Sequence, residues 1–228
     1  MIPPGLPPAG APVARHELEA LPAEIAPRLV GARIRTEDAD GAAVTVVITE
    51  VEAYHGRGTG AVADPGSHAR MGPTARNATM WGEPGHLYVY LSHGIHSCVN
   101  IVCGPEGTAG GVLLRAGWVV AGVDVAERRT GRAGRDLVRG PGRLGQALGL
   151  RHPVHDGIDA ITGAERAGLR AGLWWRQGEV EVASGPRVGV AGIAGTDAFP
   201  WRFWLAGDRS VSPFRWGRGA QSGRPRLP

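Results

Sequence analysis

Three short apolar segments follow one another in the middle of the chain with only turns between them. They span Leu87–Leu91, Ser97–Cys103 and Gly111–Ala116, and each has the length and composition of a strand. Strands joined by short turns pair antiparallel, because a parallel crossover needs about a dozen residues or more. Regular alternation of strand and helix is missing. We therefore predict an α+β fold, a single compact domain with a curved, mainly antiparallel sheet flanked by helices.

Other segments complete this prediction. Apolar periodicity predicts a helix over Glu17–Val30, and β-branched residues predict a strand over Val44–Val51. A glycine-rich loop is expected over His55–Pro73. The further helices expected are Thr74–Met80, Val123–Arg128 and Pro141–Leu148, and the further strands are Val180–Ala183, Val188–Ala191 and Phe203–Ala206.

The chain of 228 residues shows no internal linker and no repeat, so one domain is expected over residues 14–214. Residues 1–13 are rich in Pro, Gly and Ala and are predicted to lack fixed structure. Residues 215–228 combine four arginines with Gly, Ser and Pro, which predicts a flexible basic tail. A monomer is the simplest expectation.

Composition excludes several classes of protein. All 25 basic residues are arginine, so a lysine Schiff base and a lysine-containing phosphate loop are excluded. Two cysteines are too few for a four-cysteine zinc site, and the spacing of His86, His93 and His96 matches no metal motif. We expect neither a metal nor a cofactor. No run approaches the roughly 18 apolar residues that span a bilayer, and no secretory signal is recognisable, so a cytoplasmic protein is expected.

The charge is distributed unevenly along the chain. Residues 1–114 hold 7 arginines against 11 acidic residues, whereas residues 115–228 hold 18 against 10. A basic half beside an acidic half indicates a surface for a polyanion such as nucleic acid. An arginine-rich composition with a basic tail would raise the isoelectric point equally well.

Glu52 lies where a predicted strand runs into the glycine-rich loop, a position that suits a general base facing a pocket. Strand alternation places Glu50, Glu52 and Tyr54 on one side, opposite Val51 and Ala53. Two carboxylates so close could also serve a glycoside-type hydrolysis. The plainer alternative is a pair of solvated glutamates on an edge strand.

Two further segments could bind parts of a nucleic acid. Tyr88 and Tyr90 share one strand face, where aromatic rings can stack on a planar base, although half-buried sheet tyrosines would look the same. The loop Gly140–Leu144 precedes a predicted helix, so its amides and Arg143 could hold a phosphate. A simple turn before the helix is the alternative.

Together these segments resemble the alkyladenine (3-methyladenine) DNA glycosylase family of monofunctional base-excision repair enzymes. The resemblance covers about Leu29 to Ser212 and rests on several long motifs in order. The matching stretches are Thr49–Gly56, Ser67–His68, Thr74–Gly82, Pro84–Cys103, Val112–Ala116, Gly140–Gly149, Gly185–Val190 and Arg202–Gly207.

The resemblance implies an enzyme that flips a damaged purine out of double-stranded DNA and hydrolyses its N-glycosidic bond. Alkylated or deaminated purines, such as 3-methyladenine, hypoxanthine and ethenoadenine, are the implied substrates in nucleoid DNA. Glu52 falls at the family's catalytic glutamate, and Arg115 at the arginine that helps to hold the attacking water. The implied base-binding residues are Tyr54, His68 and Tyr90, which sandwich the base, and Asn100, which disfavours the amine of guanine.

His93 departs from the family pattern, which has a tyrosine that wedges into the gap left by the flipped base. Histidine is smaller and more polar, so a weaker or pH-sensitive wedge is expected. Two other functions remain open from the sequence. One is a catalytically silent module that binds damaged or distorted DNA, and the other is a formyl-transfer or carbohydrate-active hydrolase that uses Glu50 and Glu52.

Overall fold

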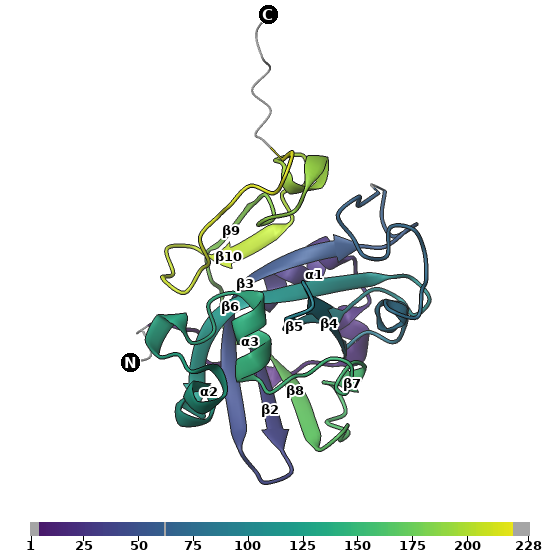
Figure 1. Ribbon diagram of the computed structural model, residues 1–228. Helices are drawn as coiled ribbons and strands as arrows, with labels where there is room; N and C mark the ends of the chain where they lie inside the picture. The colour runs from purple at the N-terminus through teal and green to yellow at the C-terminus, as the bar shows by residue number, and fades with distance from the viewer. Residues whose placement is uncertain (1–4, 62, 221–228) are drawn as a thin grey trace, which may run out of the picture.

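The structure, a computed structural model, describes residues 5–61 and 63–220 (Figure 1). In these ranges ten strands form one sheet, not closed into a barrel, and every pairing between named strands is antiparallel. Three α-helices accompany the sheet, so the predicted α+β architecture is confirmed. The helices are α1 (Pro22–Leu29), α2 (Val123–Thr130) and α3 (Pro141–Ala147). None of the helices in the described part of the chain could cross a membrane.

The strands run in the order β1-β8-β2-β3-β6-β5-β4-β7 across the sheet. The longest strand, β3, pairs with β6 along its length, with β2 over its first half and with β10 over its second half. The sheet therefore forks at β3, and β9 extends the branch beyond β10 (Figure 1). The strand bounds are β1 Ala9–Pro12, β2 Arg33–Asp38, β3 Ala43–His55, β4 His86–Ser92, β5 His96–Val102, β6 Gly110–Ala121, β7 Ile158–Asp159, β8 Leu169–Arg176, β9 Val182–Gly185 and β10 Arg202–Leu205.

A β-bulge in β3 changes which of its side chains face the hydrophobic core. The β3–β6 register shifts between Ile48 and Glu50 and again between Glu50 and Val51. An extra residue in one strand turns the following side chains to the other face. Glu50, Glu52 and Tyr54 therefore share the face opposite the core, as strand alternation predicts. The core residues of β3 are Val44, Val46 and Ile48 before the bulge, and Val51 and Ala53 after it.

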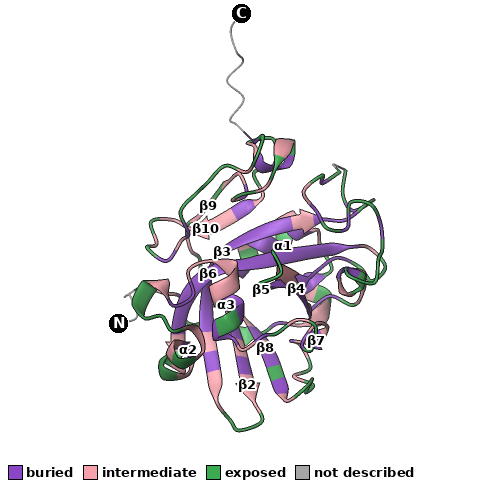
Figure 2. Cartoon of the chain, viewed as in Figure 1, coloured by how far each residue is buried: buried purple, intermediate pink, exposed green. Residues whose placement is uncertain are grey.

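The hydrophobic core lies along β3 and β6, which are buried over most of their length (Figure 2). Helix α1 begins at Pro22, whose fixed φ suits the first helical position, and buries Ile25, Ala26 and Leu29 against this core. Because the chain forms only a 3₁₀ turn at Arg15–Leu18 before it, the helix is shorter than the predicted Glu17–Val30.

Helix α3 lies directly against β5 because two glycines on one helix face allow a close approach. A Cβ added at Gly145 would lie 2.1 Å from the carbonyl oxygen of Ser97, and one at Gly142 would lie 2.8 Å from Cβ of His96. Both positions therefore need the absence of a side chain. This contact fixes α3 beside the hairpin formed by β4 and β5.

Two sequence predictions are wrong in ways that matter for the site. The predicted strand Val188–Ala191 is a loop, because the amide of Val188 donates to the Glu52 carboxylate and no strand pairs with it. The predicted helix Thr74–Met80 is a turn followed by a 3₁₀ helix at Ala78–Trp81. Here the Asn77 side chain accepts from the amide of Thr74 and donates to two backbone carbonyls, which holds a turn in place of a helix.

The sequence reading also missed strands outside the central sheet segments. β2 and β8 were not predicted, and Ala9–Pro12, within the segment expected to lack fixed structure, pairs with β8 as an edge strand. Of the predicted tail, residues 215–220 are described and pack through backbone hydrogen bonds of Arg215 and Arg218 on the loop at 189–192. Residues 221–228 lie outside the described residues.

Replacing Gly145 with alanine tests the contact between α3 and β5. Alanine normally stabilises a helix interior by up to about 1 kcal/mol relative to glycine. Here the added methyl group meets backbone, so we expect a loss of about 1–3 kcal/mol in the free energy of unfolding. Chemical denaturation measures the change. Gly82→Ala is the control, because its new Cβ would have its nearest neighbour at 3.5 Å. We expect its free energy of unfolding to change by less than about 0.5 kcal/mol. A stabilised Gly145→Ala protein would contradict the close contact.

Candidate active site

A cavity of about 550 Å³ opens beside the second half of β3, between the β4–β5 hairpin and the loop at 188–191. We call it the aromatic cavity. Six of the predicted residues meet in it, although they come from four strands and two loops that are far apart in the sequence. The predicted residues that line it are Tyr54, His68, Tyr90, His93, Asn100 and Arg115, and further lining comes from Arg70, Met80, Tyr88, Cys98, Leu113 and Val188.

The aromatic side chains of this cavity pack on one another. The rings of Tyr88 and Tyr90 stack with centroids 5.4 Å apart, and His68 meets Tyr90 edge to face at 4.7 Å. The Nδ1 atom of His68 lies 3.3 Å from the hydroxyl of Tyr88. The ring of Tyr54 comes from β3. The cavity therefore offers aromatic surface from two separate strands, β3 and β4, which suits a flat, planar ligand.

Glu52 has no exposed surface and lies behind the wall of the aromatic cavity. Its Oε2 atom accepts a hydrogen bond from the Tyr54 hydroxyl at 2.8 Å and one from Nη1 of Arg115 at 3.3 Å. Its Oε1 atom accepts from the amide of Val188 at 2.7 Å. A carboxylate has about four acceptor positions, so the three donors within the described ranges leave one unused. The reading of Glu52 as a solvated residue on an edge strand is wrong.

Glu50 is equally buried, but its carboxylate is fully occupied. Oε1 accepts from Nε of Arg115, Nε of Arg202 and the Ser212 hydroxyl, at 3.1, 2.7 and 2.8 Å. Oε2 accepts from the Ser212 amide at 2.7 Å. Four donors, two of them from arginine side chains, hold this carboxylate inside the protein. Glu50 is thus a structural anchor, which weighs against a paired-carboxylate hydrolase.

Arg115 connects the two glutamates and lines the aromatic cavity. Burial alone would lower the pKa of its guanidinium, but the charges of Glu52 and Glu50 outweigh burial and raise that pKa. The arginine is therefore permanently charged. Burial, followed by the Glu52 charge, also raises the pKa of Tyr54 well above its ordinary value, so its hydroxyl stays protonated and donates to Glu52.

A buried ion pair, which the sequence analysis did not identify, packs against the ring of Tyr54. Arg187 and Asp64 form two charged hydrogen bonds at 2.7 and 2.8 Å, and both side chains are fully buried. The guanidinium of Arg187 lies over the ring of Tyr54 at 4.5 Å and also faces Trp201. Arg187 occurs in one of the stretches that resemble the family, and this resemblance could have marked it as a site residue. Asp64 lies in a loop that has no such resemblance.

Asn100 is buried and held by its neighbour on β4. Its Nδ2 donates to the Tyr88 carbonyl oxygen at 3.3 Å, across the pair formed by these two residues in the β4–β5 ladder. The amide group therefore has a fixed orientation at the cavity wall.

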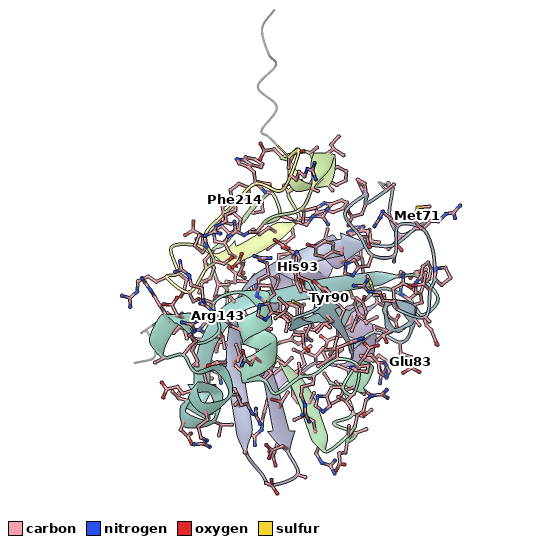
Figure 3. The ribbon with its side chains drawn as sticks, in the orientation of Figure 1. Met71, Glu83, Tyr90, His93, Arg143 and Phe214 are labelled. Atoms are coloured by element: carbon pink, nitrogen blue, oxygen red, sulfur yellow. The ribbon has the colours of Figure 1, made fainter. Side chains whose placement is uncertain are left out.

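His93 lies at the tip of the β4–β5 hairpin, with a left-handed backbone conformation and an exposed side chain. Figure 3 shows it close to Tyr90, in front of the sheet.

Arg143 lies apart, in α3, where its Nη1 atom donates to the carbonyl oxygens of Asp136 and Arg139. It does not line the aromatic cavity. Within the described ranges, no group of three or more His, Cys, Asp or Glu is arranged to hold a metal ion.

Two histidines near the cavity have pKa values below the ordinary 6.5. For His68 the main cause is loss of hydration, and Arg76 and Arg70 add to it. For His55, stacked on Trp201 at 4.4 Å, burial is the main cause. The Nε2 atom of His55 accepts from the amide of Ala23, so it must be unprotonated for this bond.

The low pKa of His55 predicts a loss of stability in acid. Below pH 6.5 the unfolded chain binds a proton at this imidazole that the folded chain resists, so the free energy of unfolding falls as the pH falls. Urea denaturation at about pH 7.5, 6.5 and 5.5 measures this decline, because these values span the range in which a histidine titrates. His55→Gln keeps an acceptor for Ala23 and should lose stability less steeply. Parallel declines in the two proteins would show that His55 is not responsible.

Comparison with known proteins agrees with this site. The model of the methylpurine-DNA glycosylase (MPG) family matches residues 16–209. A protein of Leifsonia xyli is 50% identical over 198 residues, which cover 84% of this chain and 87% of the relative. A protein of Nocardia farcinica is 45% identical over 207 residues, 90% of this chain and 92% of the relative. A protein of Mycobacterium leprae is 42% identical over 205 residues, 89% of each.

Each of these relatives bears the provisional name 3-methyladenine DNA glycosylase. The family model and the relatives cover most of the chain, and the resemblance inferred from the sequence motifs is confirmed. The chain therefore belongs to the methylpurine-DNA glycosylase family and is a hydrolase of N-glycosyl bonds.

Proposed function

We propose that the protein is a monofunctional DNA glycosylase for alkylated or deaminated purines, of the 3-methyladenine, hypoxanthine and ethenoadenine class. It flips the damaged nucleotide out of double-stranded DNA into the aromatic cavity and hydrolyses the N-glycosidic bond with a water that Glu52 activates. The protein acts as a monomer on chromosomal DNA, through a glycosylase domain of residues 14–214. The family membership supports the reaction class, and the geometry of the cavity supports the mechanism.

The unused acceptor position of Glu52 carries this proposal. A water beside the aromatic cavity can donate a hydrogen bond to that position, while Arg115 at 3.3 Å orients the carboxylate. Cleavage of the bond builds positive charge on the sugar, and the nearby carboxylate stabilises that charge. The carboxylate then accepts the proton as the water oxygen bonds to the sugar carbon. The base departs with the bonding electrons.

The aromatic rings bind the base and help to select it. A purine made cationic by alkylation stacks favourably on the faces of tyrosine rings and leaves readily. The rings of Tyr54 and Tyr90 and the imidazole of His68 surround this base. Because the pKa of His68 is lowered, its ring is neutral at pH 7 and does not repel a cationic base. The sequence has no lysine amine to attack the sugar, which agrees with a monofunctional enzyme.

Asn100 discriminates against normal guanine in this scheme. Its amide is fixed by the bond to the Tyr88 carbonyl, so it cannot swing away to admit a bulky group. The exocyclic amine of guanine would meet this amide, whereas adenine derivatives and hypoxanthine lack that amine. Rejection of an unmatched polar group in a dry site is a strong source of specificity.

Replacing the carboxylate tests the mechanism. Glu52→Gln keeps the shape of the side chain but cannot accept a proton, so we expect base release to fall by about 10²–10⁴-fold. Affinity for lesion-containing DNA should be kept. Single-turnover release of 3-methyladenine, hypoxanthine and ethenoadenine from duplex oligonucleotides measures the first effect, and a binding titration measures the second.

Glu83→Gln is the matched control, because Glu83 is half-exposed and lies far from His93 and Tyr90 in Figure 3. Its activity should equal that of the wild type. Retained base release in Glu52→Gln would contradict the role of Glu52. A wild type that binds lesion-containing DNA and releases no base would establish the alternative, a silent module for damaged DNA.

His93 is proposed as the wedge that fills the gap left by the flipped nucleotide. Flipping costs a few kcal/mol in duplex DNA and less in a single strand. We therefore expect His93→Ala to slow excision from duplex DNA about tenfold and to leave excision from a single strand nearly unchanged. Single-turnover rates on both substrates measure this. Equal losses on both substrates would assign His93 to base binding and not to the wedge.

A further inference from the structure

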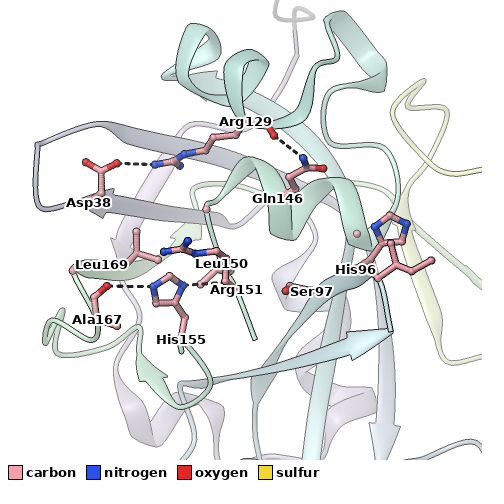
Figure 4. Close-up of a pocket in the computed structure, with 14 residues that line it drawn as sticks. Asp38, His96, Ser97, Arg129, Gln146, Leu150, Arg151, His155, Ala167 and Leu169 are labelled. Atoms are coloured by element: carbon pink, nitrogen blue, oxygen red, sulfur yellow. Dashed lines mark hydrogen bonds and ion pairs between the residues drawn. The ribbon is translucent and has the colours of Figure 1, made fainter. Parts of the chain in front are cut away.

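A second cavity, of about 670 Å³, lies below α3, between the start of β5, the end of α2 and the loop before β8 (Figure 4). Nothing in the proposed base-excision mechanism uses it. Polar and charged side chains supply much of its wall, among them Asp38, His96, Arg129, Gln146 and Arg151. Figure 4 shows these side chains around one space, with Arg129 directed at Asp38.

The two cavities share a wall. Ser92, His93 and Cys98 of the β4–β5 hairpin line the aromatic cavity, whereas Ile95, His96 and Ser97 of the same hairpin line the second one. Helix α3 is divided in the same way, because Pro141 lines the aromatic cavity and its neighbour Gly142 lines the second. The hairpin tip therefore stands between two openings.

The charge of the second cavity favours an anion. Arg129 is occupied by Asp38 at 3.0 Å and by the Ala147 carbonyl. Arg151 is exposed, and no hydrogen bond or ion pair within the described ranges involves its guanidinium. The exposed ring of His96 lies at the rim of the same space. One positive charge is thus available for a ligand.

The segment beside this cavity adds to the positive charge. Six arginines lie between residues 128 and 143, at the end of α2 and the start of α3. Four of them pair with Asp124, Asp38 and Asp136, whereas Arg132 and Arg135 are exposed and make no ion pair within the described ranges. Several arginines on one surface are typical of contacts to a nucleic-acid backbone.

The position of the hairpin indicates which DNA strand lies here. When a side chain at the tip enters the stack and a nucleotide leaves on one side, the unpaired partner base and its strand remain on the other side of the tip. We infer that the second cavity binds the phosphodiester backbone of the undamaged strand opposite the flipped nucleotide, with Arg151 as a phosphate contact. This inference rests on the proposed function, which assigns the flipped base to the aromatic cavity.

Comparing duplex with single-stranded DNA tests the inference. The probes are an oligonucleotide with a tetrahydrofuran abasic analogue, alone and paired with its complement, titrated with the full-length protein at several salt concentrations. Arg151→Ala should weaken duplex binding about fivefold at 0.1 M salt and lower the salt dependence by about one phosphate contact. Binding of the single strand should change less than about twofold, because a single strand has no opposite strand to hold.

Two further variants make the result specific. Arg151→Lys keeps the charge and should restore most of the duplex affinity, which a loss of folding or packing would not allow. Arg170→Ala is the control, because Arg170 is exposed on β8 and alternates with the cavity residue Leu169, so it faces the other side of the strand. Arg170→Ala should bind both probes like the wild type.

Two results would overturn the inference. One is duplex binding that Arg151→Ala leaves unchanged, and the other is an equal loss on duplex and single strand, which would place Arg151 on the damaged strand. The proposed function fails separately, if the wild-type protein releases no base from lesion-containing DNA, because the binding comparison uses a probe without a base to release.

Discussion

The buried pairing of two glutamates with two arginines is the constraint on which the rest of the structure depends. Glu50 and Glu52 have no exposed surface, and Arg115 and Arg202 are nearly as deeply buried. Removing ions from water costs several kcal/mol each, and only complete pairing with good geometry offsets that cost. Loss of one partner would leave an uncompensated charge in the protein interior. Every element that supplies a member of this group must therefore dock in a single arrangement.

The two glutamates differ in the number of hydrogen-bond donors that surround each carboxylate. Glu50 accepts from four donors and holds Arg115 in place, whereas Glu52 accepts from three. The bulge in β3 makes this possible, because it turns both carboxylates away from the hydrophobic core that the preceding half of the strand faces. A regular strand would direct the same residues into apolar surroundings. The proposed catalytic carboxylate is thus placed by an irregularity in a long central strand.

Much of this arrangement could be predicted from the sequence. The run of central strands specified the antiparallel sheet, and period-two alternation put Glu50, Glu52 and Tyr54 on one face. The bulge is also visible in the sequence, because the apolar core residues Ile48 and Val51 are three positions apart and not two. The loop at 188–191 could not be predicted, because its valines have strand composition. Only the carboxylate of the distant Glu52, which accepts from the amide of Val188, holds this segment as a loop. Pairings between distant residues, such as Asp64 with Arg187, leave no local pattern at all.

The fork in the sheet has a consequence for how the enzyme is made in the cell. Tyr54 and Arg115 reach Glu52 from the first 115 residues of the chain, but the amide of Val188 comes later, and Arg202 and Ser212, which complete the surroundings of the Glu50 carboxylate, come later still. A nascent chain emerges from the ribosome in that order. Until its last portion has been translated and has docked on β3, Glu50 and Glu52 are only partly surrounded by donors. With Glu52 in its proposed role, the ability to cut a glycosidic bond therefore arises as the final step of synthesis and not gradually.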